Sequence, residues 1–126
     1  MHKAFAFLAA TLMLAGTVSS ATLELGMELM QTIEDLNKSL SSNIALRDAR
    51  ATLADAKELD GLFTQVEAHF IARGDAANAV ELSKKSRTLT QAIIQSAGSS
   101  DFEAATNAAT DLSRTCRTCH TFYKKE

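Results

Sequence analysis

Apolar residues recur in alternating steps of three and four along most of the chain after about residue 22. This spacing places them on one face of a helix, and no stretch of the chain looks like a β-strand. The pattern is most regular near the C-terminus, where the apolar face comprises Phe102, Ala105, Ala109, Leu112, Cys116, Cys119 and Tyr123. A second such face comprises Leu46, Ala49, Leu53, Ala56, Phe63, Val66 and Phe70. The predicted fold class is therefore all-α.

Three short segments interrupt the helical pattern. Ser41-Ser42-Asn43 offers side chains that compete with helix continuation. Arg73-Gly74-Asp75 and Ala97-Gly98-Ser99-Ser100 each combine a glycine, typical of a helix C-terminus, with a following N-cap residue. The predicted helices are Thr22–Leu40, Asn43–Arg73, Asp75–Ala97 and Ser100–Lys125. Short connections make successive helices antiparallel, so we expect an up-down-up-down four-helix bundle.

Two local features refine this prediction. Ser100 and Glu103 have the spacing of a capping box, in which each side chain accepts a hydrogen bond from a free backbone N–H at the other position. Asp60 and Gly61 interrupt the apolar face of the second predicted helix, where they favour a kink or a division.

The first twenty residues have the pattern of a secretory signal peptide. A short basic start at Lys3 precedes an apolar run over 4–15, and small residues around Ala21 suit a signal peptidase. An uncleaved membrane anchor is the alternative, but the apolar run is short for a permanent span and no later segment is apolar enough. We predict a signal peptide over 1–20 and one domain over 21–126, with a periplasmic location.

Composition supports helices and limits the partners. The chain has no proline, and helix-forming residues dominate. Its formal net charge of −2 becomes −3 without the signal peptide, because Lys3 is the only charged residue removed. Such a balance argues against nucleic acid or an anionic membrane as a partner, since either would require a basic surface.

The sequence Cys116-Arg117-Thr118-Cys119-His120 has the spacing of a c-type haem attachment site. The two thiols lie on neighbouring turns of one helical face, where each can add to a haem vinyl group, and His120 can bind the iron. A zinc site would need four ligands, and the chain has no second motif to supply them. A redox-active dithiol normally accompanies a strand-to-helix context. A chance pair of core cysteines is the remaining alternative.

A sixth iron ligand is available near the start of the first predicted helix. In an antiparallel bundle this end lies beside the end of the last helix, and Met27 would be roughly 7 to 8 Å into its helix, level with His120. Met30 lies one turn deeper and nearer the middle of the apolar face. Both methionines could instead be ordinary core residues.

The segment Ala21-Thr22-Leu23-Glu24-Leu25-Gly26-Met27-Glu28 resembles the start of the soluble cytochrome b-562 family, and the last forty or so residues, through Leu112, His120 and Tyr123, resemble its end. The resemblance implies a haem held by Met27 and His120. The middle of the chain differs, and the C-x-x-C motif is instead similar to cytochrome c-prime and its c-556 relatives.

From these features we expect a periplasmic electron-transfer protein, not an enzyme, with one haem c whose iron is bound by His120 and Met27. Its partners would be periplasmic redox proteins, with no stable membrane insertion, and it would be a monomer or a homodimer. The alternative is a five-coordinate, gas-binding protein like cytochrome c-prime. A small helical module whose two cysteines form a disulfide is a third class, and the colour of the purified protein would distinguish it.

Overall fold

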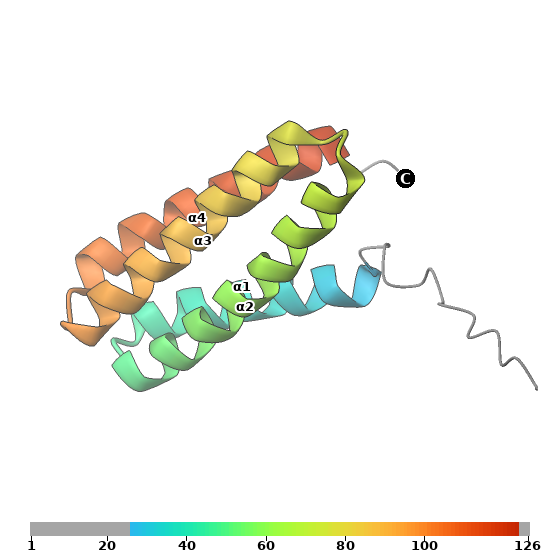
Figure 1. The fold of residues 1–126 in the computed structure, drawn as a ribbon. Helices are drawn as coiled ribbons and strands as arrows, with labels where there is room; N and C mark the ends of the chain where they lie inside the picture. Colours follow the sequence, from blue (N-terminus) through green and yellow to red (C-terminus); the bar gives the residue numbers. More distant parts are fainter. Residues whose placement is uncertain (1–25, 124–126) are drawn as a thin grey trace, which may run out of the picture.

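Four helices run alternately up and down the long axis of the molecule (Figure 1). This computed structural model describes residues 26–123, so the predicted signal peptide over 1–20 lies outside the described residues. The helices are α1 (Met27–Ala45), α2 (Ala49–Arg73), α3 (Ala77–Gly98) and α4 (Phe102–Tyr123). The predicted all-α, antiparallel four-helix bundle is confirmed.

The core follows the predicted spacing, although many of its side chains are small and polar. The buried positions of α2 are Thr52, Ala56, Leu59, Phe63, Val66 and Phe70, and those of α3 are Ala79, Ser83, Ser86, Thr90, Ile93 and Ala97. The buried hydroxyls on α3, those of Ser83, Ser86 and Thr90, each donate to a carbonyl of the preceding turn, as Ser83 does to Ala79 at 2.7 Å. Small side chains let two backbones approach closely, and α2 and α3 form the most extensive helix pair.

The first interruption was predicted several residues too early. Helix α1 continues through Ser41, whose hydroxyl donates to the Asn37 carbonyl at 3.0 Å. Asn43 donates to the Asp55 carboxylate on α2 at 2.8 Å, so this side chain joins two helices instead of ending one. The actual turn has Arg47 in the left-handed region (φ 55°) and Asp48 as the N-cap of α2, accepting from the Ala51 N–H at 3.0 Å.

This shift exposes Leu46, which the sequence pattern had placed on the buried face of the second helix. Its side chain is 74% exposed, because the residue lies in the turn. The predicted kink or division at Asp60-Gly61 does not break the helix, since α2 runs continuously from Ala49 to Arg73. Asp60 instead faces α3, where its carboxylate lies 3.7 Å from the Arg87 guanidinium.

In the turn between α2 and α3, the prediction that Gly74 ends a helix is correct, but the prediction that Asp75 caps the next helix is wrong. Gly74 has a left-handed conformation (φ 74°) and ends α2, as expected of a C-terminal glycine. Asp75 does not cap α3, because its carboxylate binds the Arg73 guanidinium at 3.1 Å. Helix α3 begins two residues beyond the predicted start, at Ala77, without a side-chain cap.

The predicted capping box is wrong by one residue. Gly98 remains helical, and Ser100 takes the left-handed conformation (φ 58°) that ends the turn. Asp101 is the residue that caps α4, since its carboxylate accepts from the Ala104 N–H at 3.0 Å. The Asp101 N–H donates back to the Ser96 carbonyl at 2.8 Å, and the N–H groups of Ser99 and Ser100 also donate to carbonyls at the end of α3, so the connection between α3 and α4 is short and well ordered by hydrogen bonds.

Helix α1 also begins later than the predicted Thr22. Gly26 has an extended backbone (φ −60°, ψ 144°), and its carbonyl accepts from the N–H groups of Leu29 and Met30. Met27 is therefore the first residue of α1. Toward this end α1 diverges from α3 and α4 (Figure 1), and it packs less against α4 than α3 does. No helix in the described part of the chain has the length and apolar character needed to cross a membrane.

Candidate functional site

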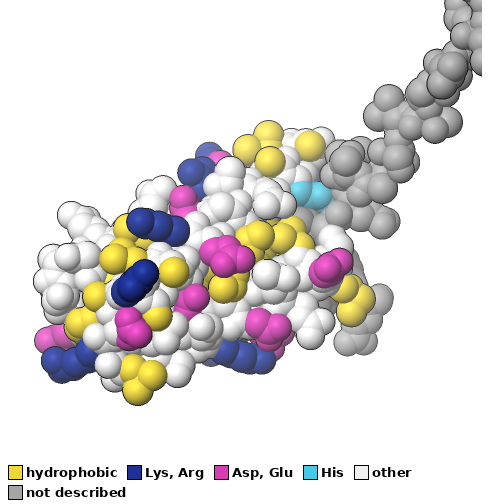
Figure 2. Space-filling view, turned by 90° about the horizontal axis from the view of Figure 1, so that it is seen from below, with side chains coloured by type: hydrophobic (Ala, Val, Ile, Leu, Met, Phe, Trp, Pro, Cys, Tyr) yellow, Lys and Arg dark blue, Asp and Glu magenta, His cyan; other side chains and the backbone are white. Residues whose placement is uncertain are grey.

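The divergence of α1 from α4 leaves a cavity of about 770 Å³ at one end of the bundle, with walls from all four helices. Phe63, Val66 and Phe70 of α2, with Leu82 of α3, form an apolar wall. In Figure 2 hydrophobic side chains are visible on one face of the molecule between acidic ones, with a histidine beside them. This size lies within the range of about 300 to 1,000 Å³ that is typical of sites for small molecules and cofactors.

The predicted haem-binding residues all line this one cavity. Cys116, Cys119 and His120 come from α4, and Met27 and Met30 come from α1 at the other end of the chain. The antiparallel path of the chain brings these two segments to the same end of the bundle (Figure 1). The structure thus brings these five residues to one cavity, and their role in binding haem stays a prediction.

Both cysteines are half-buried free thiols. Burial in the cavity wall raises the pKa of Cys116 to about 11, and the neighbouring Cys119 adds to this shift. Burial also raises the pKa of Cys119. Both side chains are therefore neutral thiols near pH 7, and Cys116 packs against the hydrophobic core.

The two methionines differ in exposure. Met27 is 89% exposed, whereas Met30 is half-buried and packs against the core. The expected match in height between Met27 and His120 relied on a helix that began at Thr22. Because α1 begins at Met27, that argument no longer favours Met27 over Met30. The choice between them stays a prediction.

A polar side of the cavity is formed where α1 faces α4. Gln31, Glu34 and Asn37 line it from α1, and Ser113 and Arg117 line it from α4. The Asn37 amide donates to the Ser113 hydroxyl at 3.4 Å, while its Oδ1 atom is buried without a hydrogen-bond partner. The cavity is therefore amphipathic, because apolar side chains of α2 and Leu82 of α3 line it together with these polar groups.

Asn37 and Tyr123 contribute to the site in ways that sequence reasoning missed. Asn37 lies two turns after Met30 on the same side of α1. A polar residue at a position where the apolar spacing expects a buried one could have indicated that Asn37 lines the site. Tyr123 was expected only on the apolar face. Its hydroxyl accepts from the Ala79 N–H at 3.2 Å, and its ring packs 5.2 Å from the Phe70 ring. These contacts attach the end of α4 to α2 and α3 beside the cavity.

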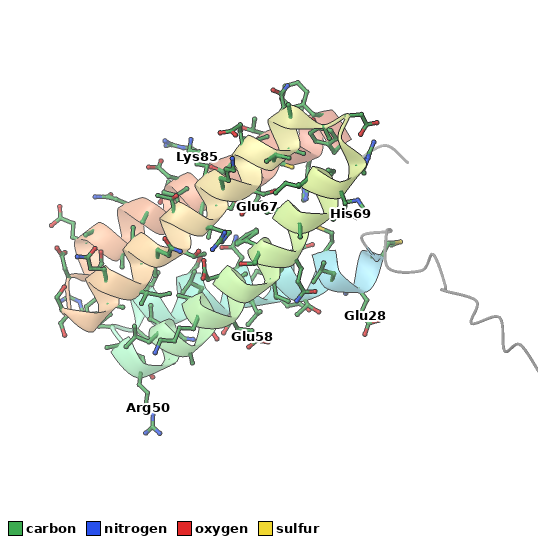
Figure 3. All side chains as sticks on the ribbon, viewed as in Figure 1. Glu28, Arg50, Glu58, Glu67, His69 and Lys85 are labelled. Carbon is green, nitrogen blue, oxygen red and sulfur yellow. The ribbon has the colours of Figure 1, made fainter. Side chains whose placement is uncertain are left out.

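Arg114, His69 and Glu67 lie near the cavity in the sequence or the fold but are not among the residues that line it. Arg114 pairs with Asp111 at 3.5 Å and does not line the cavity, in contrast to Arg117. His69 also does not line it, and its ring lies edge-on to Phe70 at 5.0 Å. Figure 3 shows His69 near the end of α2 and Glu67 on the same helix, where Glu67 binds Arg87 at 2.9 Å.

Within residues 26–123, no three His, Cys, Asp or Glu side chains are grouped so that they could hold a metal ion together. Comparison of the chain with protein-family models, with curated proteins and with solved structures finds no match.

Proposed function

We propose that this protein is an exported electron-transfer cytochrome that binds one covalently attached haem in the cavity between α1 and α4. The observation that supports this most is the meeting of the C-x-x-C-H motif of α4 with Met27 and Met30 of α1 around one cavity. A C-x-x-C-H motif alone could occur on any surface. A haem whose iron is bound by a histidine and a methionine would require such a motif and a thioether around one cavity.

The cavity fits a haem in size and in polarity. Its volume of about 770 Å³ is large enough for a cofactor of this class. The apolar wall suits a flat macrocycle, and the polar side with Arg117 suits the carboxylates at its edge. Both thiols are free and line the cavity, as covalent attachment would require. When bound, the haem would supply an iron that takes up and releases one electron.

Each residue then has a definite role. Cys116 and Cys119 would hold the haem through thioethers, and His120 would bind the iron from α4. Met27 would bind it from α1, with Met30 as the less favoured alternative. A thioether ligand favours ferrous iron and raises the reduction potential, and two axial ligands leave little room for chemistry on a small molecule. Electron exchange with periplasmic redox proteins is the activity that this site supports.

One observation favours a second candidate, a five-coordinate gas-binding protein. Met27 is 89% exposed at the very start of α1, so it can turn away from the cavity. If Met30 also remains against the core, His120 alone would bind the iron, and apolar residues such as Phe63 would line the rest of the cavity. A small gas could then bind there.

Covalent attachment is tested by expressing the full chain with a haem-attachment system and then extracting the purified protein with acid and organic solvent. We expect the haem to stay with the protein, and the intact mass to equal the sum of chain and haem. Cys116→Ala and Cys119→Ala should each retain a single thioether. Haem that leaves the unaltered protein intact would show that attachment is not covalent.

The proximal ligand is tested with His120→Ala. This variant should lose the low-spin spectrum of the unaltered protein, while His69→Ala, the matched control outside the cavity, should keep it. The opposite pattern would transfer the ligand role to His69.

A further inference from the structure

Three sulfur-containing side chains of moderate burial line the same cavity. Cys116 and Cys119 come from one side of α4, and Met30 comes from the opposing α1. Met30 and Cys116 both pack against the core cluster, so these two side chains have a defined environment before any cofactor is attached. Met27 also lines the cavity, but at 89% exposure it is mostly surrounded by solvent.

This donor set suits one metal in particular. Thiolate and thioether are soft ligands, which select Cu(I), zinc or iron–sulfur clusters over the harder cations. Structural zinc almost always takes four ligands in a tetrahedron, and no group of even three His, Cys, Asp or Glu converges within residues 26–123. Monovalent copper needs no such group, because it is stable in linear or trigonal sulfur environments. Apolar neighbours such as Val66 and Phe70 also favour the ion of lower charge.

We propose that the haem-free form of this protein binds one Cu(I) ion through the sulfur atoms of Cys116 and Cys119, with the Met30 thioether as the third ligand. Binding breaks the S–H bond of each cysteine and forms two sulfur–copper bonds. Two protons leave to solvent, the copper stays monovalent throughout, and no oxidant or reductant takes part. Met30 is preferred to Met27 because it is already held against the core.

The proposal has a consequence for maturation of the protein. A cysteine sulfur that is bound to copper cannot at the same time form a thioether. Bound Cu(I) and covalent haem therefore exclude one another at Cys116 and Cys119. This consequence rests on the proposed haem function, whereas copper binding itself does not.

The test is a titration of the haem-free full chain, reduced and under anaerobic conditions, with Cu(I) supplied as its acetonitrile complex and a coloured Cu(I) chelator as competitor. We expect one tightly bound Cu(I) per chain and thiolate-to-copper absorption in the near ultraviolet. Cys116→Ser and Cys119→Ser should each abolish binding in competition with the chelator. Met30→Leu should weaken it by about tenfold or more, while Met27→Leu, the matched control, should leave it unchanged. Far-ultraviolet circular dichroism of each variant checks that the bundle is still folded.

Failure to compete with the chelator would overturn the proposal, as would binding that persists when both cysteines are serine. Equal effects of Met30→Leu and Met27→Leu would overturn the assignment of the third ligand. The outcome is independent of the haem experiments: a chain that accepts covalent haem but no Cu(I) would refute only this inference. A chain that binds Cu(I) but never accepts haem would refute only the proposed function.

Discussion

The two cysteines are the residues whose chemistry depends most on their surroundings. Their sequence spacing predicted a shared helical face, and the structure adds that this face borders a cavity and that both thiols are half-buried. Burial disfavours the thiolate and so raises the pKa of both groups, that of Cys116 to about 11. Sequence reasoning could not give this shift, because it depends on the packing of α4 against the other helices.

The raised pKa predicts slow alkylation of Cys116 in the haem-free protein, because only the thiolate is a good nucleophile. Its reaction rate with iodoacetamide should rise from about pH 9 to about pH 11, following the folded-state pKa. Over the same range the folded protein should lose stability, because an unfolded thiol ionises at its ordinary pKa of 9.0 while the folded one stays protonated. Mass spectrometry of alkylated peptides measures the rate. A rate that already levels off near pH 9 would contradict this environment.

The two methionines predict different results on substitution. Met27→Ala should open the iron of the haem protein, giving a high-spin spectrum and a lower reduction potential. Met30→Ala should cost mainly packing, about 1 to 2 kcal/mol, since its side chain is only half-buried. Absorption spectra and urea unfolding separate the two effects. A high-spin spectrum produced by Met30→Ala alone would place the ligand one turn deeper.

At the scale of helices, the sequence predicted the four elements well and their ends poorly. The spacing of apolar residues identified the buried face of α4, but small polar core residues such as Ser83 and Thr90 weakened the pattern in α3. Ser41-Ser42-Asn43 stays helical because Asn43 bonds to Asp55 on another helix, a tertiary contact that no local signal contains. The turn between α1 and α2 contains no glycine, and Arg47 adopts the left-handed conformation there. Without a glycine, the sequence contains no local indication of this turn.

The connection between α3 and α4 gives a test of the revised cap. Ser100→Gly should stabilise the protein by about 1 kcal/mol, because Ser100 has a positive φ of 58° that glycine adopts without strain. Asp101→Ala should destabilise it by about 1 kcal/mol through loss of the bond to the Ala104 N–H. Urea unfolding of the haem-free protein measures both. Destabilisation by Ser100→Gly would support the capping box that the sequence had predicted.

At the scale of the whole molecule, the cavity is the feature that sequence reasoning could not foresee. The sequence pattern could place Met27 and His120 at one end of an antiparallel bundle, because the order of the helices alone determines this. It could not show that α1 diverges from α4 there, since divergence depends on how four helices pack together. A haem between α1 and α4 would add contacts between two helices that pack little against each other.

This arrangement predicts that the first turns of α1 are the least protected helical segment of the haem-free protein. Met27, Met30 and Gln31 border the cavity, and Met27 and Gln31 are exposed while Met30 is only half-buried. Hydrogen exchange should be fast over 27–33 and should slow markedly once haem is attached, while exchange in the middle of α3 should change little. Equal protection of the start of α1 in both forms would contradict a haem that joins α1 to α4.

The central claim is that the cavity holds a covalently attached haem whose iron is bound from both sides, by His120 and by a methionine of α1. The most direct measurement is the absorption spectrum of the protein, purified after expression with a haem-attachment system, in both oxidation states, with and without carbon monoxide. We predict a low-spin spectrum in each state and no change of the reduced spectrum on addition of carbon monoxide. A high-spin spectrum that carbon monoxide converts at once would contradict the second axial ligand and support the gas-binding alternative. A colourless protein would contradict the presence of haem altogether.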